Sequence, residues 1–371
     1  MTYLSGQGDA DWTRSSAGGG KTIREAYAEA CTWLAGRGVA EAAANAELLL
    51  QELLGWSRTK MLLNWSEPFP EDEKGLQWQQ WLGRKAMGEP VQYIIGEQTF
   101  YGLDFRVGPA VLIPRPETEL LVERVLKLGA QLWPDAPRDD GAGGAAGSSR
   151  GAAVAMSDAG DGEQSNAAAT SGGAAGGATA PTVGGAAGAV AEESPAARRP
   201  VLGDVGTGSG AIPVTIAVKR PDWRVYGSDI SAAALEMARG NAARHGARVE
   251  WLEGDLLEPY ISGGVDLDIL VSNPPYIPAG DMAGLQPEVR LYEPQLALVG
   301  GEDGLVFYRR LADELRRLPR LPQLVAFEVG QGQADGVLAL LQSVHAWQES
   351  EIVLDLAGIS RHVIVYDRVR A

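Results

Sequence analysis

The sequence predicts an α/β fold in which a mainly parallel sheet follows a small helical bundle. From residue 200 onward, short runs of valine, isoleucine and leucine alternate with helical segments, a pattern typical of parallel strands joined by crossover helices. Before residue 90, apolar residues recur at helical spacing instead. With 371 residues, of which 45% are hydrophobic, the chain is long enough to form two domains with separate cores.

The chain up to residue 90 divides into a lead-in and a bundle. Residues 1–20 are polar and end in three glycines, so we expect a disordered lead-in. Residues 21–90 carry apolar stripes at helical spacing and predict a helical bundle. One of its helices is expected to end at Gly55, because glycine readily adopts the left-handed conformation that closes a helix.

A connector at residues 91–117 joins the bundle to the second domain. Two short runs on either side of Gly102, residues 99–101 and 103–107, predict a hairpin. Pro116 then marks the start of a helix. The predicted buried face of that helix consists of Leu121, Val122, Val125 and Leu128.

Residues 135–199 interrupt the second domain with glycine, alanine and serine. A segment with so few large apolar residues cannot bury enough surface to offset the entropy lost on ordering. We therefore expect a disordered insertion, which a surface loop tolerates because loop closure costs little additional entropy. We assign this insertion no catalytic role.

The second domain, residues 118–371, carries the predicted sheet. Near its end, residues 352–355 and 362–366 lie on either side of Gly358 and predict a final antiparallel pair. The predicted sheet therefore has seven strands. The five strands before that pair are expected at residues 201–205, 224–228, 249–252, 267–272 and 323–328.

Charge and composition weigh against several classes of function. The net charge is −16, whereas a nucleic-acid binder needs lysine and arginine to displace counterions from phosphates, so we expect no direct nucleic-acid substrate. A single cysteine excludes an internal disulfide, and the three scattered histidines offer no metal-ligand spacing. We see neither a signal-peptide pattern nor a membrane span, and expect a cytoplasmic protein without a bound metal.

A glycine-rich turn follows the first of the five strands. It consists of Gly206, Thr207, Gly208, Ser209 and Gly210. Glycines permit positive φ and a close approach of the backbone to a ligand. Asp229 ends the next strand, where an acid holds ribose hydroxyls in Rossmann-like nucleotide-binding units. Asp255 and Leu256 follow the third strand, and offer a carboxylate and a backbone N–H to an adenine edge.

Asn273, Pro274, Pro275 and Tyr276 form the most informative stretch of the chain. They follow a buried strand, and two successive prolines forbid helix and sheet and fix the backbone. The Asn273 amide oxygen and the Pro274 carbonyl then offer two acceptors at fixed spacing, which suits a planar nitrogen group with two hydrogens. Tyr276 is placed to pack on a flat substrate. An enzyme that methylates an amide or an exocyclic amine needs such a turn.

These motifs resemble those of class I S-adenosylmethionine-dependent methyltransferases that act on nitrogen. Further segments are similar to the HemK/PrmC family, the glutamine-N5 methyltransferases of peptide chain release factors. They are EPVQYIIG at 89–96, FYG at 100–102, LIPRPETE at 112–119, YEP at 292–294 and GGEDGL at 300–305. The resemblance covers roughly residues 21–134 and 200–370.

The resemblance implies a Rossmann-like, seven-stranded class I methyltransferase sheet, with S-adenosyl-L-methionine as cofactor and a bundle that docks the protein substrate. The implied reaction is methylation of the glutamine in the Gly-Gly-Gln motif of release factors, by a protein that we expect to be a monomer. The implied cofactor-binding residues are Gly206, Thr207, Gly208, Ser209, Gly210, Asp229, Asp255, Leu256 and Asn273. The implied catalytic residues are Asn273, Pro274 and Tyr276, and Pro275, Arg115 and Glu117 join these three in binding the substrate.

Several alternatives remain open at this stage. A glutamine methyltransferase for a ribosomal protein would share the same core, and the bundle and the LIPRPETE segment favour release factors over it. An adenine-N6 DNA methyltransferase shares the Asn-Pro-Pro-Tyr turn but needs a basic recognition region that the chain lacks. A non-catalytic cofactor-binding protein has no need of two aimed acceptors. Because Gly206, Gly208 and Ala211 also fit the dinucleotide pattern, a nicotinamide or flavin enzyme is separated only by a cofactor titration.

Overall fold

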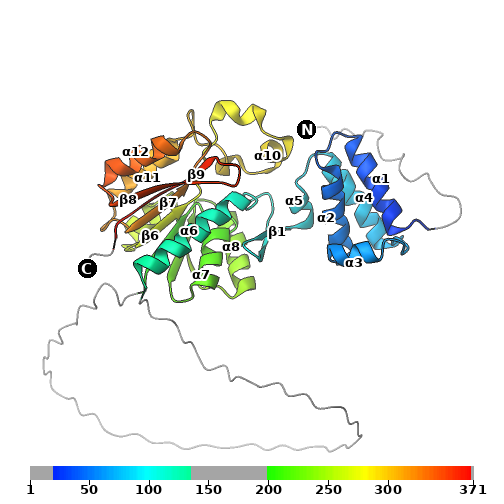
Figure 1. Cartoon of the computed structure of the whole chain (residues 1–371), viewed down its shortest axis with the longest axis horizontal. Coiled ribbons are helices and arrows are strands. Elements are labelled where there is room, and N and C mark those ends of the chain that lie inside the picture. The colour runs from blue at the N-terminus through cyan, green and yellow to red at the C-terminus, as the bar shows by residue number, and fades with distance from the viewer. Residues whose placement is uncertain (1–19, 135–198, 369–371) are drawn as a thin grey trace, which may run out of the picture. The chain divides into compact units, whose positions relative to one another are not determined.

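The computed structural model describes residues 20–134 and 199–368, which belong to one compact unit (Figure 1). A second unit, residues 139–195, falls outside the described residues. The predicted lead-in and the predicted insertion therefore lie outside the description, apart from Gly20 and Arg199 at their ends.

Helices form the predicted bundle in the N-terminal part of the chain. They are α1 (Ile23–Ala35), α2 (Ala42–Leu54), α3 (Arg58–Leu63), α4 (Glu73–Ala86) and α5 (Val91–Ile95). α1 starts at a capping box, in which the side chains of Thr22 and Glu25 each accept the other's backbone N–H. α2 ends at Gly55 with a φ of 64°, as predicted. The core of the bundle includes Trp78, which is fully buried.

The predicted hairpin pairs β1 (Glu97–Phe100) with β2 (Leu103–Arg106) in antiparallel orientation. The Asn241 side chain of α8 (Ala232–His245) accepts the Arg106 N–H at 2.8 Å and donates to the Arg106 carbonyl at 3.0 Å. The same amide donates to the Ser209 carbonyl at 2.8 Å. This buried side chain therefore joins the connector to the glycine-rich turn.

The sheet has the seven predicted strands within the described residues, in the order β5-β4-β3-β6-β7-β9-β8. They are β3 (Val201–Val205), β4 (Arg224–Asp229), β5 (Val249–Glu253), β6 (Ile269–Ser272), β7 (Leu324–Glu328), β8 (Glu349–Leu354) and β9 (Ser360–Tyr366). β3 to β7 are parallel, and β9 lies between β7 and β8, antiparallel to both. This confirms the predicted fold class. The strand order reverses beside β3, and ligands bind at such a switch point in open α/β sheets.

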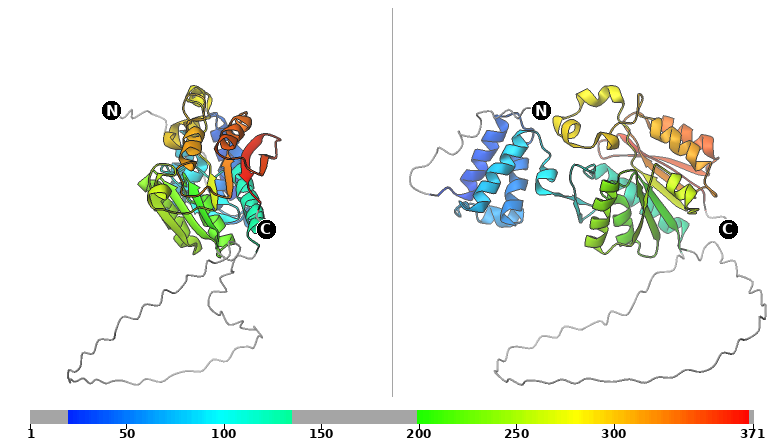
Figure 2. Two further views of the ribbon diagram at one scale, coloured as in Figure 1. Left: turned by 90° about the vertical axis from the view of Figure 1, so that its left-hand side faces the viewer. Right: turned by 180° about the vertical axis from the view of Figure 1, so that it is seen from behind.

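Helices cover both faces of the sheet (Figures 1 and 2). On one face, α6 (Pro116–Leu132) and α7 (Ala211–Lys219) pack with α8 against the parallel strands. On the other face lie α9 (Glu258–Ser262), α11 (Val306–Leu315) and α12 (Ala334–Val344). The predicted inner face of α6 is fully buried, and this burial fixes the start of α6 beside the sheet edge.

Short helices form the segment between β6 and α11, and this segment contacts the bundle. They are η1 (Ala279–Gly284), α10 (Pro287–Tyr292) and η2 (Gln295–Ala297). Lys85 of α4 is fully buried, forms an ion pair with Glu288 of α10 and donates to the Glu89 carbonyl at 3.0 Å. The Tyr292 hydroxyl donates to the Met87 carbonyl at 2.9 Å. The α10 segment is thereby held to the end of α4.

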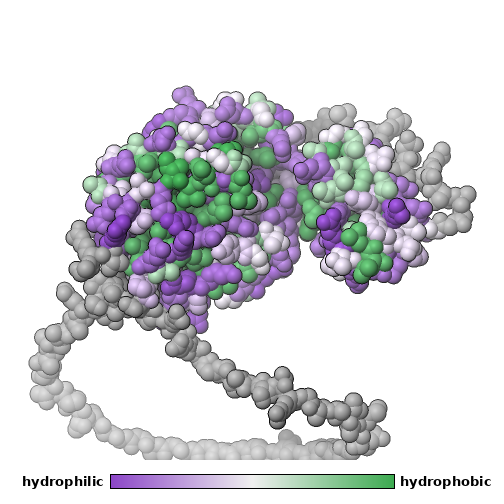
Figure 3. Space-filling view, viewed as in Figure 1, coloured by the Kyte–Doolittle hydropathy of each residue, from purple (hydrophilic) through white to green (hydrophobic). Residues whose placement is uncertain are grey.

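Hydrophilic residues cover most of the surface visible in Figure 3, and hydrophobic residues gather near β7 and β9. Across residues 20–134 and 199–368, no helix combines the length and the apolar character needed to cross a bilayer.

Candidate active site

A cavity of about 350 Å³ opens at the carboxyl ends of β3, β4 and β6, where the strand order reverses. It brings together most of the residues predicted for the site: Arg115, Gly206, Thr207, Gly208, Ser209, Asp229, Asp255, Leu256, Asn273, Pro274 and Pro275. Three predicted residues do not line it. Gly210 lies at the start of α7, and Glu117 and Tyr276 line a smaller neighbouring pocket.

The glycine-rich turn forms the floor of the cavity after β3. Gly206, Gly208 and Gly210 have φ values of 72°, 55° and 80°, a region that side chains with a Cβ rarely adopt. The turn is closed by the Thr207 N–H, which donates to the Ser228 carbonyl of β4 at 2.9 Å. A bound molecule can therefore approach the backbone between β3 and α7 closely.

Asp229 holds the turn from the end of β4. Its carboxylate accepts the backbone N–H groups of Gly208 and Ser231, each at 2.9 Å. Burial raises the pKa of Asp229 above its ordinary value, and these N–H donors oppose the shift. The carboxylate is thus fixed in place at the cavity wall.

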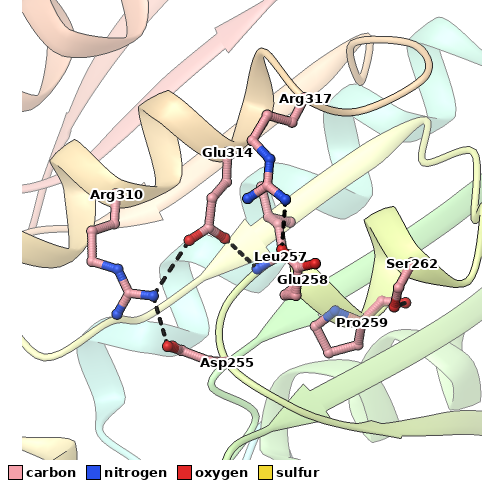
Figure 4. Close-up of polar contacts among 8 residues, drawn as sticks. All are labelled: Asp255, Leu257, Glu258, Pro259, Ser262, Arg310, Glu314 and Arg317. Carbon is pink, nitrogen blue, oxygen red and sulfur yellow. Dashed lines mark hydrogen bonds and ion pairs between the residues drawn. The ribbon is translucent and has the colours of Figure 1, made fainter.

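The loop after β5 forms the other end of the cavity and depends on residues of α11 (Figure 4). Leu256 has a φ of 47°, which is strained for a residue with a side chain. The Glu314 carboxylate accepts the Leu257 N–H at 2.9 Å, and Arg310 donates to Asp255 at 2.7 Å and to Glu314 at 3.4 Å. The Asp255 carboxylate expected to meet adenine is therefore already paired with an arginine.

The Asn-Pro-Pro-Tyr turn follows β6 and is held from two sides. The Asn273 side-chain nitrogen donates to the Thr118 hydroxyl at 3.2 Å, and Thr118 donates to the Glu328 carboxylate at 2.6 Å. The Tyr276 carbonyl accepts the Gln333 side chain at 2.9 Å. Because the amide nitrogen of Asn273 is bonded to Thr118, its oxygen is the atom left to accept from a bound molecule.

A second, smaller pocket of about 170 Å³ lies next to Tyr276. Its lining consists of Arg115, Glu117, Tyr276, Glu328 and Arg361. Arg115 also lines the large cavity, and its guanidinium bonds the buried Glu293 at 2.5 Å. The predicted substrate residues Arg115 and Glu117 therefore lie beside the turn but on its far side from the glycine-rich floor.

Four residues of the site were missed by the sequence analysis: Thr118, Asp204, Arg310 and Glu328. Asp204 and Glu328 interrupt apolar strands with a charge, and this is the signal that could have identified them. Thr118 was read as part of a helix start, and nothing local distinguishes Arg310 from its arginine neighbours.

Asp204 carries the clearest sign of a missing cationic partner. It is completely buried, and neither of its carboxylate oxygens has a hydrogen-bond partner among the described residues. Burial raises the pKa of Asp204 to about 7. A buried carboxylate next to the glycine-rich turn suits a cofactor with a positively charged end, and S-adenosylmethionine has two such groups. Within the described residues, no cluster of side chains has the composition of a metal site.

Comparison with known proteins identifies similar sequences over both parts of the chain. Residues 25–96 match the family model of the PrmC N-terminal domain, and residues 189–285 match that of the methyltransferase small domain. The release factor glutamine methyltransferase of Bacillus anthracis is 34% identical, covering 85% of this chain and 90% of that protein. Its counterpart in Bacillus subtilis (strain 168) is 35% identical, covering 92% and 97%. The one in Moorella thermoacetica is 35% identical, covering 94% and 99%.

Proposed function

The chain belongs to the family of release factor glutamine methyltransferases, and on that premise we propose that it transfers a methyl group from S-adenosyl-L-methionine to a release factor. The acceptor is the side-chain nitrogen of the glutamine in the Gly-Gly-Gln motif. The protein is thus a methyltransferase that depends on S-adenosylmethionine and methylates glutamine.

The cofactor supplies an electrophilic methyl group carried on a positively charged sulfur. We assign the turn from Gly206 to Gly210 to its methionine part, where the backbone leaves room for it. Asp204 provides the negative charge that complements a cation, and Asp229 the acceptors for ribose hydroxyls. Asp255 and Leu256 remain our assignment for the adenine end.

The chemical difficulty lies in the amide nitrogen of the substrate. Its lone pair is delocalised into the carbonyl, and no side chain of this site deprotonates it near neutral pH. Catalysis therefore depends on position and on polarisation of the nitrogen rather than on a strong base.

In our proposal, Asn273 and Pro274 supply that position. The Asn273 side-chain oxygen and the Pro274 carbonyl each accept one N–H of the substrate amide, which stabilises the positive charge that grows on nitrogen. Pro275 keeps the backbone of the turn fixed, and the Tyr276 ring packs on the flat amide. The proton then leaves to water, because a methylated and positively charged amide nitrogen is strongly acidic.

The rest of the substrate is assigned to the second pocket and to the bundle. Arg115 and Glu117 offer one charge of each sign next to the turn, which suits the backbone of an extended loop. The helical segment from residue 21 to 90 is our candidate for the docking domain, and the connector at 91–117 and the domain at 118–371 keep their predicted roles.

One observation carries this proposal: the Asn273 nitrogen is bonded to Thr118, so its oxygen is left as an acceptor at the cavity wall. The test is to incubate the protein with labelled S-adenosylmethionine and purified release factors, a ribosomal protein or DNA. Mass spectrometry should find one methyl group on the Gly-Gly-Gln glutamine. A release factor with asparagine at that position is the matched control and should stay unlabelled.

Label on a ribosomal protein or on DNA, with none on release factors, would overturn the proposed substrate. We further propose a cytoplasmic monomer that does not bind nucleic acid directly. Light scattering should then give 39.2 kDa for the purified chain, and a duplex should not compete with the release factor.

A further inference from the structure

A chain of three side chains connects β7 to the catalytic turn. We propose that Glu328 is a positioning residue, which sets the orientation of the Asn273 amide through the hydroxyl of Thr118. This inference rests on the proposed methyl transfer, because it concerns the oxygen that Asn273 offers to the substrate.

The geometry of the connection is that of a buried network. Thr118 is 5% exposed and Glu328 is 1% exposed, so water does not compete for either side chain. The distance from the Thr118 hydroxyl to Glu328 is 2.6 Å, which is typical of a charge-assisted bond, and the Asn273 nitrogen lies 3.2 Å from the same hydroxyl. A network with low local polarity is costly to leave unsatisfied.

The number of hydrogens decides how this network is oriented. A hydroxyl has one hydrogen to donate, and an ionised carboxylate can only accept. Thr118 therefore gives its hydrogen to Glu328 and has only lone pairs left for Asn273. The Asn273 nitrogen satisfies those lone pairs, whereas the oxygen would be repelled by them. An ionised Glu328 thus keeps the Asn273 oxygen turned to the substrate side.

Glu328 is itself held firmly. The Tyr308 hydroxyl donates to the Glu328 carbonyl at 2.7 Å, and Glu328 pairs with His362 in the β7–β9 ladder. The next residue, Val329, donates to the Arg361 carbonyl at 2.7 Å. The carboxylate therefore cannot move away to release Thr118 without disturbing the sheet.

Burial also makes the charge of Glu328 sensitive to pH. It raises the pKa of Glu328 to about 7, and the Thr118 hydroxyl opposes this shift. The titratable and charged groups that face it are Arg115 and Glu117 beside α6, Tyr276 after β6, and Arg361 and His362 on β9. Burial lowers the pKa of His362 to about 4, so His362 is neutral and adds no counter-charge. When Glu328 is protonated, it can donate to Thr118, and the hydroxyl no longer enforces one orientation of Asn273.

The first test removes the connecting hydroxyl. Thr118→Val should lower kcat about tenfold and leave KM for the cofactor within twofold, and Thr118→Ser should restore kcat because it keeps the hydroxyl. Thr215→Val is the matched control, since Thr215 is also fully buried but its hydroxyl has no partner in the described part of the chain. That control should leave kcat unchanged. A kcat for Thr118→Val equal to that of the control would overturn the inference.

The second test follows kcat against pH at saturating cofactor. For the unaltered protein, kcat should fall as the pH decreases through about 7, because protonation of Glu328 removes the constraint. Glu328→Gln should lower kcat about tenfold at pH 8 and should lose this acid limb. An unchanged acid limb in Glu328→Gln would show that another group causes it, and would exclude Glu328.

These tests separate the inference from the proposed function. If the unaltered protein methylates no release factor, the proposed function fails. If it does so and the variants at Thr118 and Glu328 retain its kcat and its pH profile, only the positioning role fails. Binding of S-adenosylhomocysteine and the thermal unfolding temperature should be measured for each variant, so that loss of the fold is recognised.

Discussion

The two ends of the cavity are held by different kinds of interaction. At the adenine end, Arg310 and Asp255 form an ion pair whose side chains are 40% and 46% exposed. At the catalytic turn, Asn273, Thr118 and Glu328 form a hydrogen-bonded chain whose last two members are buried. Solvent screens the first interaction and leaves it worth little, whereas the second loses its full strength when one member is removed.

The difference matches the tasks of the two ends. The adenine end has only to recognise a rigid ring, and it can adapt through the mobile Arg310 side chain. The catalytic turn has to aim one oxygen atom, and an error in that direction acts on the rate. We therefore expect large effects of substitution at the turn and small ones at the ion pair.

The strongest test of this contrast is Asn273→Ala. We expect kcat to fall by about 10²- to 10³-fold, because the variant loses an acceptor that acts on the charge growing in the transition state. Affinity for the cofactor should stay within about tenfold. Steady-state kinetics and calorimetry measure the two quantities. Normal turnover in this variant would refute the role of Asn273.

Asp229→Ala should come next. Removing the carboxylate leaves the Gly208 and Ser231 N–H groups without their acceptor and takes away the proposed ribose contact. A charged hydrogen bond contributes about 1.5–3 kcal/mol, so the dissociation constant for S-adenosylhomocysteine should rise roughly 10- to 100-fold. At saturating cofactor, kcat should remain near that of the unaltered protein. An unaltered dissociation constant would remove Asp229 from the cofactor site.

The charge of Asp204 predicts a dependence of cofactor binding on pH. The pKa of Asp204 is raised to about 7 in the free protein, and a cationic ligand favours the ionised form. Binding should therefore be independent of pH above about 7 and weaken up to tenfold for each unit below it. Titrations of S-adenosylhomocysteine between pH 5.5 and 8.5, pH values chosen around that pKa, measure this.

Asp204→Asn is the control for the pH dependence, since it keeps the shape of the side chain but cannot ionise. It should bind more weakly at pH 8 and lose the dependence. If the variant shows the same pH profile as the unaltered protein, another group titrates.

The smallest effect is expected for Arg310→Ala. The pair with Asp255 is half-exposed, and exposed pairs contribute about 0.2–1 kcal/mol, so the dissociation constant should change by less than about fivefold. Glu314→Gln is the sharper comparison, because Glu314 accepts the buried Leu257 N–H and supports the strained Leu256. A larger loss for Arg310→Ala than for Asn273→Ala would contradict the contrast between the two ends.

The sequence was most informative where the structure is local. The glycine-rich turn and the Asn-Pro-Pro-Tyr turn are short segments whose backbone is dictated by glycine and proline, so their conformation could be predicted directly. The strands were visible because buried parallel strands are apolar on both faces. Their bounds shifted by a few residues in β8 and β9, where half-buried positions blur the pattern.

The supporting network could not be predicted in the same way. Thr118 and Glu328 are separated by 210 positions in the chain, and Asp255 and Arg310 by 55. Only the tertiary fold brings such residues into contact, and neither spacing nor composition carries that information. The contact between Asn273 and Thr118 likewise depends on where α6 begins relative to β6.

The buried Lys85 has a consequence for how a large substrate is handled. Through Glu288 it anchors one end of the α10 segment to the bundle, and the other end reaches the reactive corner through Glu293 and Arg115. Force applied by a docking protein is therefore transmitted along a short, ion-paired strut rather than lost in a slack tether. Affinity gained at a distant surface can in this way be used to align the reacting atoms.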